Sequence, residues 1–160
     1  MRLTVLAAFL LSTAAAPVLA ADDEHSDHLS EADGLRILHA WTNATDDDHV
    51  AVYLEIENNR ATEVVLMGAE TEIAKEAHLM AIDPSTGDET EIEELPVPAG
   101  SEMELAPGGL FIELHDVAKA LSEGDEFELE LEFGDDLHLD VHVEVEAADA
   151  DSHGHAGHNH

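Results

Sequence analysis

Histidines are concentrated at the C-terminal end of this chain, where four of them alternate with small or polar residues. They are His153, His155, His158 and His160. Imidazole is a borderline ligand that suits zinc, copper and nickel, and the intervening Gly and Ala residues let a short segment fold around one ion. Because the segment holds no apolar residue larger than Ala, we expect a metal-binding tail that packs no core.

A second pair of metal-ligand types, His78 and Met80, is separated by one residue. Residues i and i+2 of a strand share a face, so an imidazole and a thioether at this spacing could hold one ion together. Cu(I) favours such soft ligands. A methionine on a strand also commonly serves core packing, so the pair alone is compatible with a metal site and with a structural role.

The composition limits which chemistry is possible. The chain has 160 residues, no Cys, 38 acidic residues against 5 basic ones, and a formal net charge of −33. Without Cys there is no disulfide and no thiolate ligand, so a metal site must use His, Met, Asp or Glu. Such a negative field repels nucleic acid and anionic membrane surfaces. It is typical of a salt-adapted surface, and it is also compatible with a surface that attracts cations.

The first twenty residues have the pattern of a signal peptide. Arg2 precedes an apolar stretch at 3–16 that is too short to span a bilayer stably, and small residues lead up to Ala20. We expect cleavage after Ala20 and export to the periplasm as a soluble protein. No Cys follows the apolar stretch, so we expect no lipid anchor. The sequence contains no Gly-x-Ser-x-Gly motif of a hydrolase, no His-Glu-x-x-His motif of a zinc protease and no phosphate-binding loop. We therefore expect that the protein is not an enzyme.

The elements that must position these ligands are predicted to be strands. Residues 127–133 and 137–145 alternate apolar and polar side chains, which is the signature of strands with one buried face, and residues 134–136 join them as a hairpin. Further strands are expected at 34–41, 50–58, 63–67, 73–82, 89–95 and 109–114, with a turn at 83–88 and one short helical turn at 117–121.

About eight or nine short strands without a long helical period favour an all-β, antiparallel β-sandwich. We expect a single domain at 34–145. A flexible acidic leader at 21–33 precedes it, and a disordered His-rich tail at 146–160 follows it.

Three groups of residues, in a fixed order, carry a family resemblance. They are AWTNAT at 40–45, AVYLEIEN at 51–58, and the pair PAG at 98–100 and APGG at 106–109. Together they resemble the periplasmic copper chaperones of the PCu(A)C family, and the resemblance covers roughly residues 34–145. It implies a cupredoxin-like fold that binds copper.

The copper ligands of that family are only partly present in this chain. The family has a His or Met after the third or fourth strand, a further Met, and a His-x-Met just past the Pro-Gly-Gly turn. Here Phe111 and Glu113 stand where the resemblance implies the latter His and Met, and the middle Met is missing. Because period two places alternate residues on one face, His78, Met80, Glu113 and His115 could still surround one ion. Such a set suits Cu(II) or Zn(II) better than Cu(I), and a decayed site is equally compatible with the pattern.

The resemblance implies a carrier that binds copper in the periplasm and delivers it to an acceptor protein, such as the copper centre of a respiratory oxidase. We expect a monomer. One alternative is a periplasmic metal buffer or zinc-binding protein that acts mainly through the tail. Another is a protein-interaction module that has lost metal binding. Of the remaining histidines, we interpret His39 as structural and His49 as part of an acidic loop at 46–48.

Overall fold

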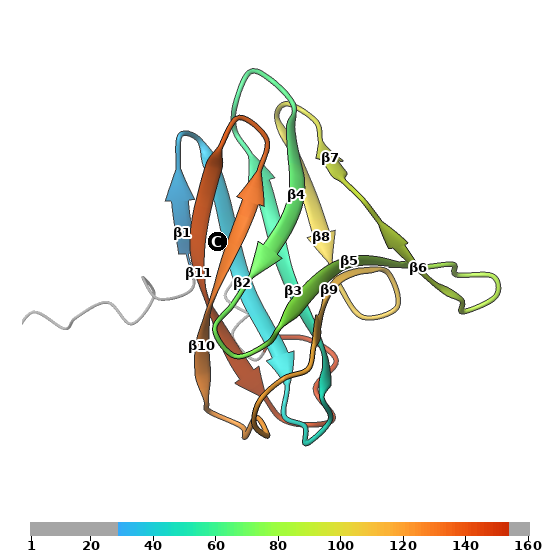
Figure 1. The fold of residues 1–160 in the computed structure, drawn as a ribbon. Coiled ribbons are helices and arrows are strands. Elements are labelled where there is room, and N and C mark those ends of the chain that lie inside the picture. Colours follow the sequence, from blue (N-terminus) through green and yellow to red (C-terminus); the bar gives the residue numbers. More distant parts are fainter. Residues whose placement is uncertain (1–28, 154–160) are drawn as a thin grey trace, which may run out of the picture.

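The computed structural model describes residues 29–153, and every regular element in this range is a strand (Figure 1). None of the described residues forms a helix that is long and apolar enough to cross a bilayer. The predicted signal peptide and three tail histidines, His155, His158 and His160, lie outside the described residues. The strands are β1 (Leu29–Ala32), β2 (Leu35–Asn43), β3 (His49–Asn58), β4 (Val64–Glu70), β5 (Glu76–Ile82), β6 (Glu89–Ile92), β7 (Leu95–Val97), β8 (Ser101–Leu105), β9 (Leu110–His115), β10 (Glu126–Phe133) and β11 (Leu137–Glu146).

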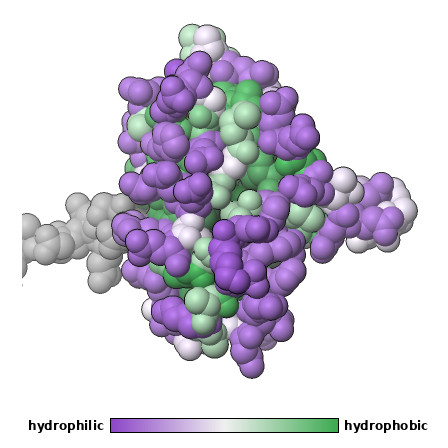
Figure 2. Space-filling model, in the orientation of Figure 1, coloured by the Kyte–Doolittle hydropathy of each residue, from purple (hydrophilic) through white to green (hydrophobic). Residues whose placement is uncertain are grey.

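The period-two pattern separates a buried face from an outward face on each long strand. In β3, Val52 and Ile56 are fully buried, whereas Ala51, Tyr53 and Glu55 between and beside them are only partly buried. The same alternation in β2, β9, β10 and β11 builds one continuous apolar core from most of the strands. Acidic side chains occupy many of the outward positions, and Figure 2 shows hydrophilic residues over most of the visible surface.

All strands belong to one curled sheet, in the order β6-β5-β9-β3-β2-β11-β10-β4-β7. β1 adds to β2, and β8 adds to β3. The sheet closes around the shared core in a near-barrel, so the predicted all-β, cupredoxin-like sandwich is confirmed. One pair departs from the antiparallel rule, because β11 runs parallel to the end of β2.

Several boundaries differ from the sequence-based expectation, and eleven strands are described rather than eight or nine. Residues 29–32, assigned to the leader, form β1 against β2. The strand predicted at 89–95 is two strands, because β6 pairs with β5 whereas β7 pairs with β4 at the other end of the sheet. No helical turn forms at 117–121. Instead, Leu121 makes an isolated bridge with Thr45 and is buried.

The two central strands each have an edge that is shared by two partners. Along one edge of β2, residues 35–38 pair with β1, and residues 41–43 pair with β11. Along the outer edge of β3, residues 49–52 pair with β9, and residues 54–58 pair with β8. These shared edges bring strands that are distant in the chain beside one another. Each shared edge adjoins one of the His-rich clusters described below.

Candidate metal centre

Three adjacent strands, β3, β9 and β5, place polar side chains in rows on their outward faces. His49 of β3 is opposite His115 of β9, which is opposite Glu76 of β5. Two residues further along each strand, Glu113 is opposite His78. Because i and i+2 share a face, all five side chains belong to one outward surface, while the intervening residues of β9 point into the core.

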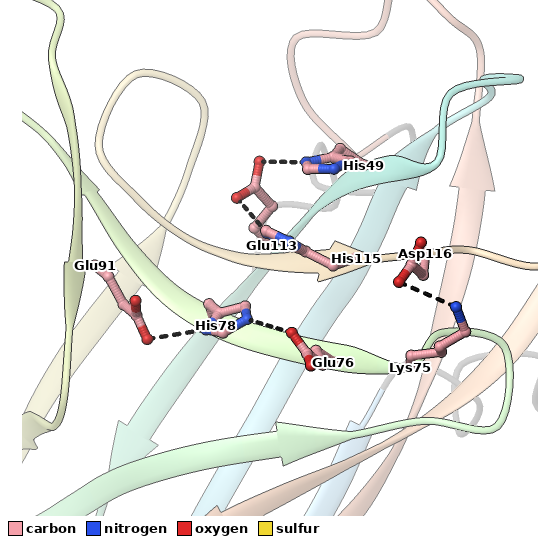
Figure 3. A network of polar contacts seen from close by, with 8 residues as sticks. All are labelled: His49, Lys75, Glu76, His78, Glu91, Glu113, His115 and Asp116. Atoms are coloured by element: carbon pink, nitrogen blue, oxygen red, sulfur yellow. Dashed lines mark hydrogen bonds and ion pairs between the residues drawn. The ribbon is translucent and has the colours of Figure 1, made fainter.

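The closest group in this surface consists of His49, Glu113 and His115, whose potential ligand atoms all lie within 4.8 Å of one another. Nε2 of His115 donates a hydrogen bond to Oε2 of Glu113 at 2.7 Å. Nδ1 of His49 lies 3.8 Å from the other carboxylate oxygen of Glu113, and the two imidazole centroids are 4.3 Å apart. Figure 3 shows the Glu113 carboxylate beside the two rings with one oxygen directed at each, so one carboxylate contacts both imidazoles.

His78 extends the group onto β5. Its ring centroid lies 4.7 Å from that of His115. Its Nδ1 donates to Oε1 of Glu91 at 2.9 Å, and its Nε2 lies 3.5 Å from Glu76 (Figure 3). The hydrogen bond that His78 donates to Glu91 stabilises the charged imidazolium and raises the pKa of His78, although partial burial opposes this effect. We refer to His49, His78, Glu113 and His115 as the β9 cluster.

Met80 lies in the next row, on the same face of β5 as His78. It is half-buried and is the register partner of Phe111 on one side and Glu91 on the other. Phe111 itself is buried, although it points away from the central core. The residue that stands at a copper-ligand position of the resembled family is therefore apolar and enclosed. Met80 is the one thioether on this surface beside the cluster.

The β9 cluster is open enough for exchange with solvent. The side chains of His115 and His78 are each 28% exposed, that of His49 is 55% exposed, and Glu113 is the most enclosed at 18%. Beyond the cluster, Lys75 pairs with Asp116 at 3.1 Å, so this cation is neutralised and points along the edge of the group (Figure 3). Glu76 and Glu91 add negative charge nearby, which favours cation capture.

Three imidazoles and a carboxylate form a donor set for a borderline divalent ion. Imidazole suits zinc and copper, and a carboxylate is a harder ligand that favours Cu(II) or Zn(II) over Cu(I). The rings are not preset around a single point, because His78 points its nitrogens toward Glu91 and Glu76. Binding would require His78 to exchange a carboxylate partner for the ion.

The structure brings together all four sandwich residues that the sequence singled out. His78 and Met80 lie on β5, Glu113 and His115 lie on β9, and these two strands are direct neighbours. Sequence reasoning missed His49, which was interpreted as part of an acidic loop. It begins β3 and shares the outward face of Ala51, but only the pairing of β3 with β9 reveals its position beside His115.

The fifth described candidate, His153, lies elsewhere. The sequence assigned it to a disordered tail, yet its side chain is 1% exposed and lies against β11. Its contacts with Glu144 and Glu146 form a separate group, considered below. A further group lies on β10 and β11, where Glu130 and Glu132 are half-buried and His138 is exposed.

Comparisons with known proteins identify the family of the chain. The family model described as "LpqE-like: Putative lipoprotein LpqE-like" matches residues 35–145. A protein of Leifsonia xyli subsp. xyli (strain CTCB07), named "Putative lipoprotein Lxx21020", is 30% identical over 139 residues, covering 84% of this chain and 82% of that protein. The chain belongs to the LpqE-like family.

Solved structures similar to this LpqE-like chain are PCu(A)C domains. The apo PmoF2 PCuAC domain has a TM-score of 0.67 at 24% identity, covering 78% of this chain and 99% of that domain. The copper-bound PCuAC domain from PmoF2 has a TM-score of 0.67 at 21% identity, covering 75% and 98%. Cu(I)-DR1885 from Deinococcus radiodurans has a TM-score of 0.57 at 22% identity, covering 67% and 74%. The LpqE-like chain therefore has the PCu(A)C fold, as the sequence resemblance implied.

Proposed function

We propose that this protein binds copper outside the cytoplasm and carries it to an acceptor protein, and that the β9 cluster is its exchange site. The observation that carries the proposal is the convergence of His49, Glu113 and His115 within 4.8 Å, with the His78 ring beside them. The same fold is found in a copper-bound PCuAC domain. The donor set favours Cu(II), and Met80 offers a softer ligand if copper arrives as Cu(I).

The partial exposure of the cluster supports a carrier rather than an enzyme. An acceptor protein could reach His49 and His115 from solvent and replace them as copper ligands one at a time. Such a transfer is a ligand exchange and needs no catalytic residue. The copper centre of a respiratory oxidase is the acceptor that we propose, and the apolar stretch at 3–16 supports export to the periplasm. We propose that the carrier acts as a monomer.

The test is an equilibrium titration of the exported chain with Cu(II) against a competing chelator. His115→Ala should weaken binding at the β9 cluster by about 10- to 100-fold, because it removes a ligand and releases Glu113. His138→Ala is the matched control, since His138 also contacts a glutamate, at 3.1 Å, but lies on β11 outside the cluster. Equal effects of the two substitutions would refute a site at the β9 cluster.

Two alternatives give different results in the same titration. A metal buffer or zinc-binding protein that works through its tail would lose most of its capacity in the triple variant His155→Ala, His158→Ala and His160→Ala, and would be insensitive to His115→Ala. An interaction module without metal function would show only weak binding that none of these variants changes. An anaerobic Cu(I) titration of Met80→Ala separates the oxidation states, because only Cu(I) binding should depend on the thioether.

A further inference from the structure

A second group of histidines and carboxylates lies where β2 and β11 run parallel. Trp41 and Asn43 of β2 are the register partners of Glu144 and Glu146 of β11. After β11 the chain turns back, and the side-chain amide of Asn43 donates hydrogen bonds to the carbonyl oxygens of Ala147 and Ala150, at 3.0 and 2.9 Å. This anchored turn returns residues 151–153 over the outward face of the sheet.

The returned segment buries His153 against the two glutamates. Its Nδ1 lies 2.8 Å from Oε1 of Glu146, and its Nε2 lies 3.6 Å from Oε2 of Glu144. The three potential ligand atoms of this group all lie within 4.8 Å of one another. The side chain of His153 is only 1% exposed, and the two carboxylates are 21% and 23% exposed. A histidine from a predicted tail thus has a fixed and enclosed position.

A second imidazole faces this group from an unusual backbone position. His39 has a positive φ of 52°, a conformation that is uncommon outside glycine and in which Asn, Asp and His are the most frequent other residues. It lies in a β-bulge, because Leu38 is opposite Glu55 and Trp41 is opposite Tyr53, which leaves two residues of β2 against one of β3. Bulges redirect side chains and often adjoin functional sites. The His39 ring centroid is 5.5 Å from that of His153.

We propose that His39, Glu144, Glu146 and His153 form a second metal site, which takes one borderline divalent cation such as Zn²⁺ or Cu²⁺. Two imidazoles and two carboxylates supply four N and O ligands, the number that zinc adopts in closed sites, and their two negative charges match those of the ion. No thioether belongs to the group, so it disfavours Cu(I). A bound ion would fasten the start of the His-rich segment to the sandwich.

A cavity of about 130 Å³ beside the group is lined by His39, Trp41, Pro107 and His153, among others. Trp41 is the single tryptophan of the chain, and it is buried although it lies outside the main core cluster. Its fluorescence therefore reports on this site. Cu²⁺ bound between His39 and His153 should quench it, and loss of the returned segment should expose it to water.

The test starts from a full-length exported chain in which five histidines of the other candidate sites are replaced. The replacements are His49→Ala and His115→Ala in the β9 cluster and His155→Ala, His158→Ala and His160→Ala in the tail. Zn²⁺ is titrated into this background with a chromophoric competitor, and Cu²⁺ is titrated while Trp41 fluorescence is recorded. We expect one equivalent of either ion to bind and Cu²⁺ to quench the fluorescence.

Two substitutions should each weaken binding in this background by about 10- to 100-fold. Glu146→Gln keeps the shape of a ligand and removes its charge, and His39→Asn keeps a residue that tolerates positive φ. The matched control is Glu132→Gln, which changes a half-buried carboxylate on β10 that belongs to neither cluster. Far-UV circular dichroism and unchanged Trp41 emission before metal is added show that the segment is still docked.

Two results would overturn the proposal. One is a background chain that binds neither ion, which would leave the group as an ion pair between His153 and the two glutamates. The other is binding that Glu146→Gln and His39→Asn change no more than Glu132→Gln does. Neither result bears on the β9 cluster, because that cluster is already disabled in the background.

Discussion

We refer to His39, Glu144, Glu146 and His153 as the β11 cluster. The β9 cluster and the β11 cluster both consist of His and Glu side chains, but they differ in how far these side chains are exposed to solvent. In the β9 cluster the imidazoles of His49 and His115 are 55% and 28% exposed, whereas the imidazole of His153 is 1% exposed. An open cluster favours exchange with a partner, and an enclosed one favours retention. If both proposed sites bind metal, one fold separates a transfer site from a structural site by covering only the second with a returned segment.

The largest expected effect is on metal affinity: substituting a histidine of one cluster should weaken binding at that cluster and leave binding at the other unchanged. His115→Ala should weaken binding at the β9 cluster, and His153→Ala should weaken binding at the β11 cluster, each by about 10- to 100-fold. The double variant should show the sum of the two free-energy losses, because separate sites without shared partners behave additively. The measurement is competition titration of the wild type, both single variants and the double variant with Cu²⁺.

A strong departure from additivity would break the comparison. It would mean that the two groups compete for one ion or share a conformational change. His138→Ala again serves as the control, because its partner Glu130 belongs to neither cluster.

The next effect concerns the cover itself. Asn43→Ala removes two hydrogen bonds to the turn at 147–150, which should lower the free energy of unfolding by about 1–3 kcal/mol. It should also release His153, shift Trp41 emission to longer wavelength, and weaken Zn²⁺ binding at the β11 cluster. Cu²⁺ affinity at the β9 cluster should stay the same. Urea denaturation measures the loss of stability, and the fluorescence of Trp41 reports the release of His153.

Thr42→Val is the control for Asn43→Ala. Thr42 is the buried residue next to Asn43 in β2, and its hydroxyl donates a hydrogen bond to the carbonyl oxygen of Ala51 rather than to the turn. It should lower stability without moving Trp41 emission. If Asn43→Ala leaves Trp41 emission and Zn²⁺ affinity unchanged, the returned segment is held by other contacts, and the proposed difference in enclosure does not depend on this anchor.

A smaller effect distinguishes the clusters by pH. The hydrogen bond to Glu91 raises the pKa of His78, so a proton competes with metal at the β9 cluster over a range that extends above the ordinary histidine pKa. Glu91→Gln should lower that pKa and move the half-point of Cu²⁺ binding to lower pH, by a fraction of a pH unit. Titrations between acid and neutral pH measure the half-point.

Glu94→Gln is the matched control for this pH effect, because it removes the same charge from the exposed stretch between β6 and β7. It should weaken cation attraction slightly without moving the half-point. A half-point that moves equally in both variants would show that general charge, rather than the bond to His78, controls the proton competition.

The strands and their buried faces could be predicted from the sequence because period two is a local signal. The hairpin at 134–136 is an example, since Asp135 and Asp136 both adopt positive φ, a conformation that Asp tolerates in tight turns. The partners of each strand were not predictable in this way. His49 was missed because its role depends on the pairing of β3 with β9, and His153 was misassigned because Asn43, more than a hundred residues earlier, anchors the turn before it. In both cases the decisive contact is long-range and polar, and no periodicity records it.

The smallest effect tests whether carboxylates without histidine behave differently from both clusters. Glu55, Glu57 and Glu102 lie together on β3 and β8, and Arg36 hydrogen-bonds to Glu57. Burial, followed by the charge of Glu102, raises the pKa of Glu55. The stabilising contribution of its protonated form is therefore complete below the ordinary pKa of glutamate and is lost as the pH rises through the raised value, so the charged form costs stability at neutral pH.

Glu55→Gln keeps that side chain neutral at every pH, and we expect it to raise the free energy of unfolding at pH 7 by about 0.5 kcal/mol at low salt, a modest figure because the group is only partly buried and solvent screens its charge. The gain should shrink in high salt, where like-charge repulsion is weaker, and should vanish at acid pH, where the wild-type carboxyl is already protonated. Urea denaturation at two pH values and two salt concentrations measures it. A loss of stability at pH 7, or a parallel loss of Zn²⁺ affinity, would mean that these acids bind a cation after all, and that histidine is not what distinguishes the two clusters from the rest of the acidic surface.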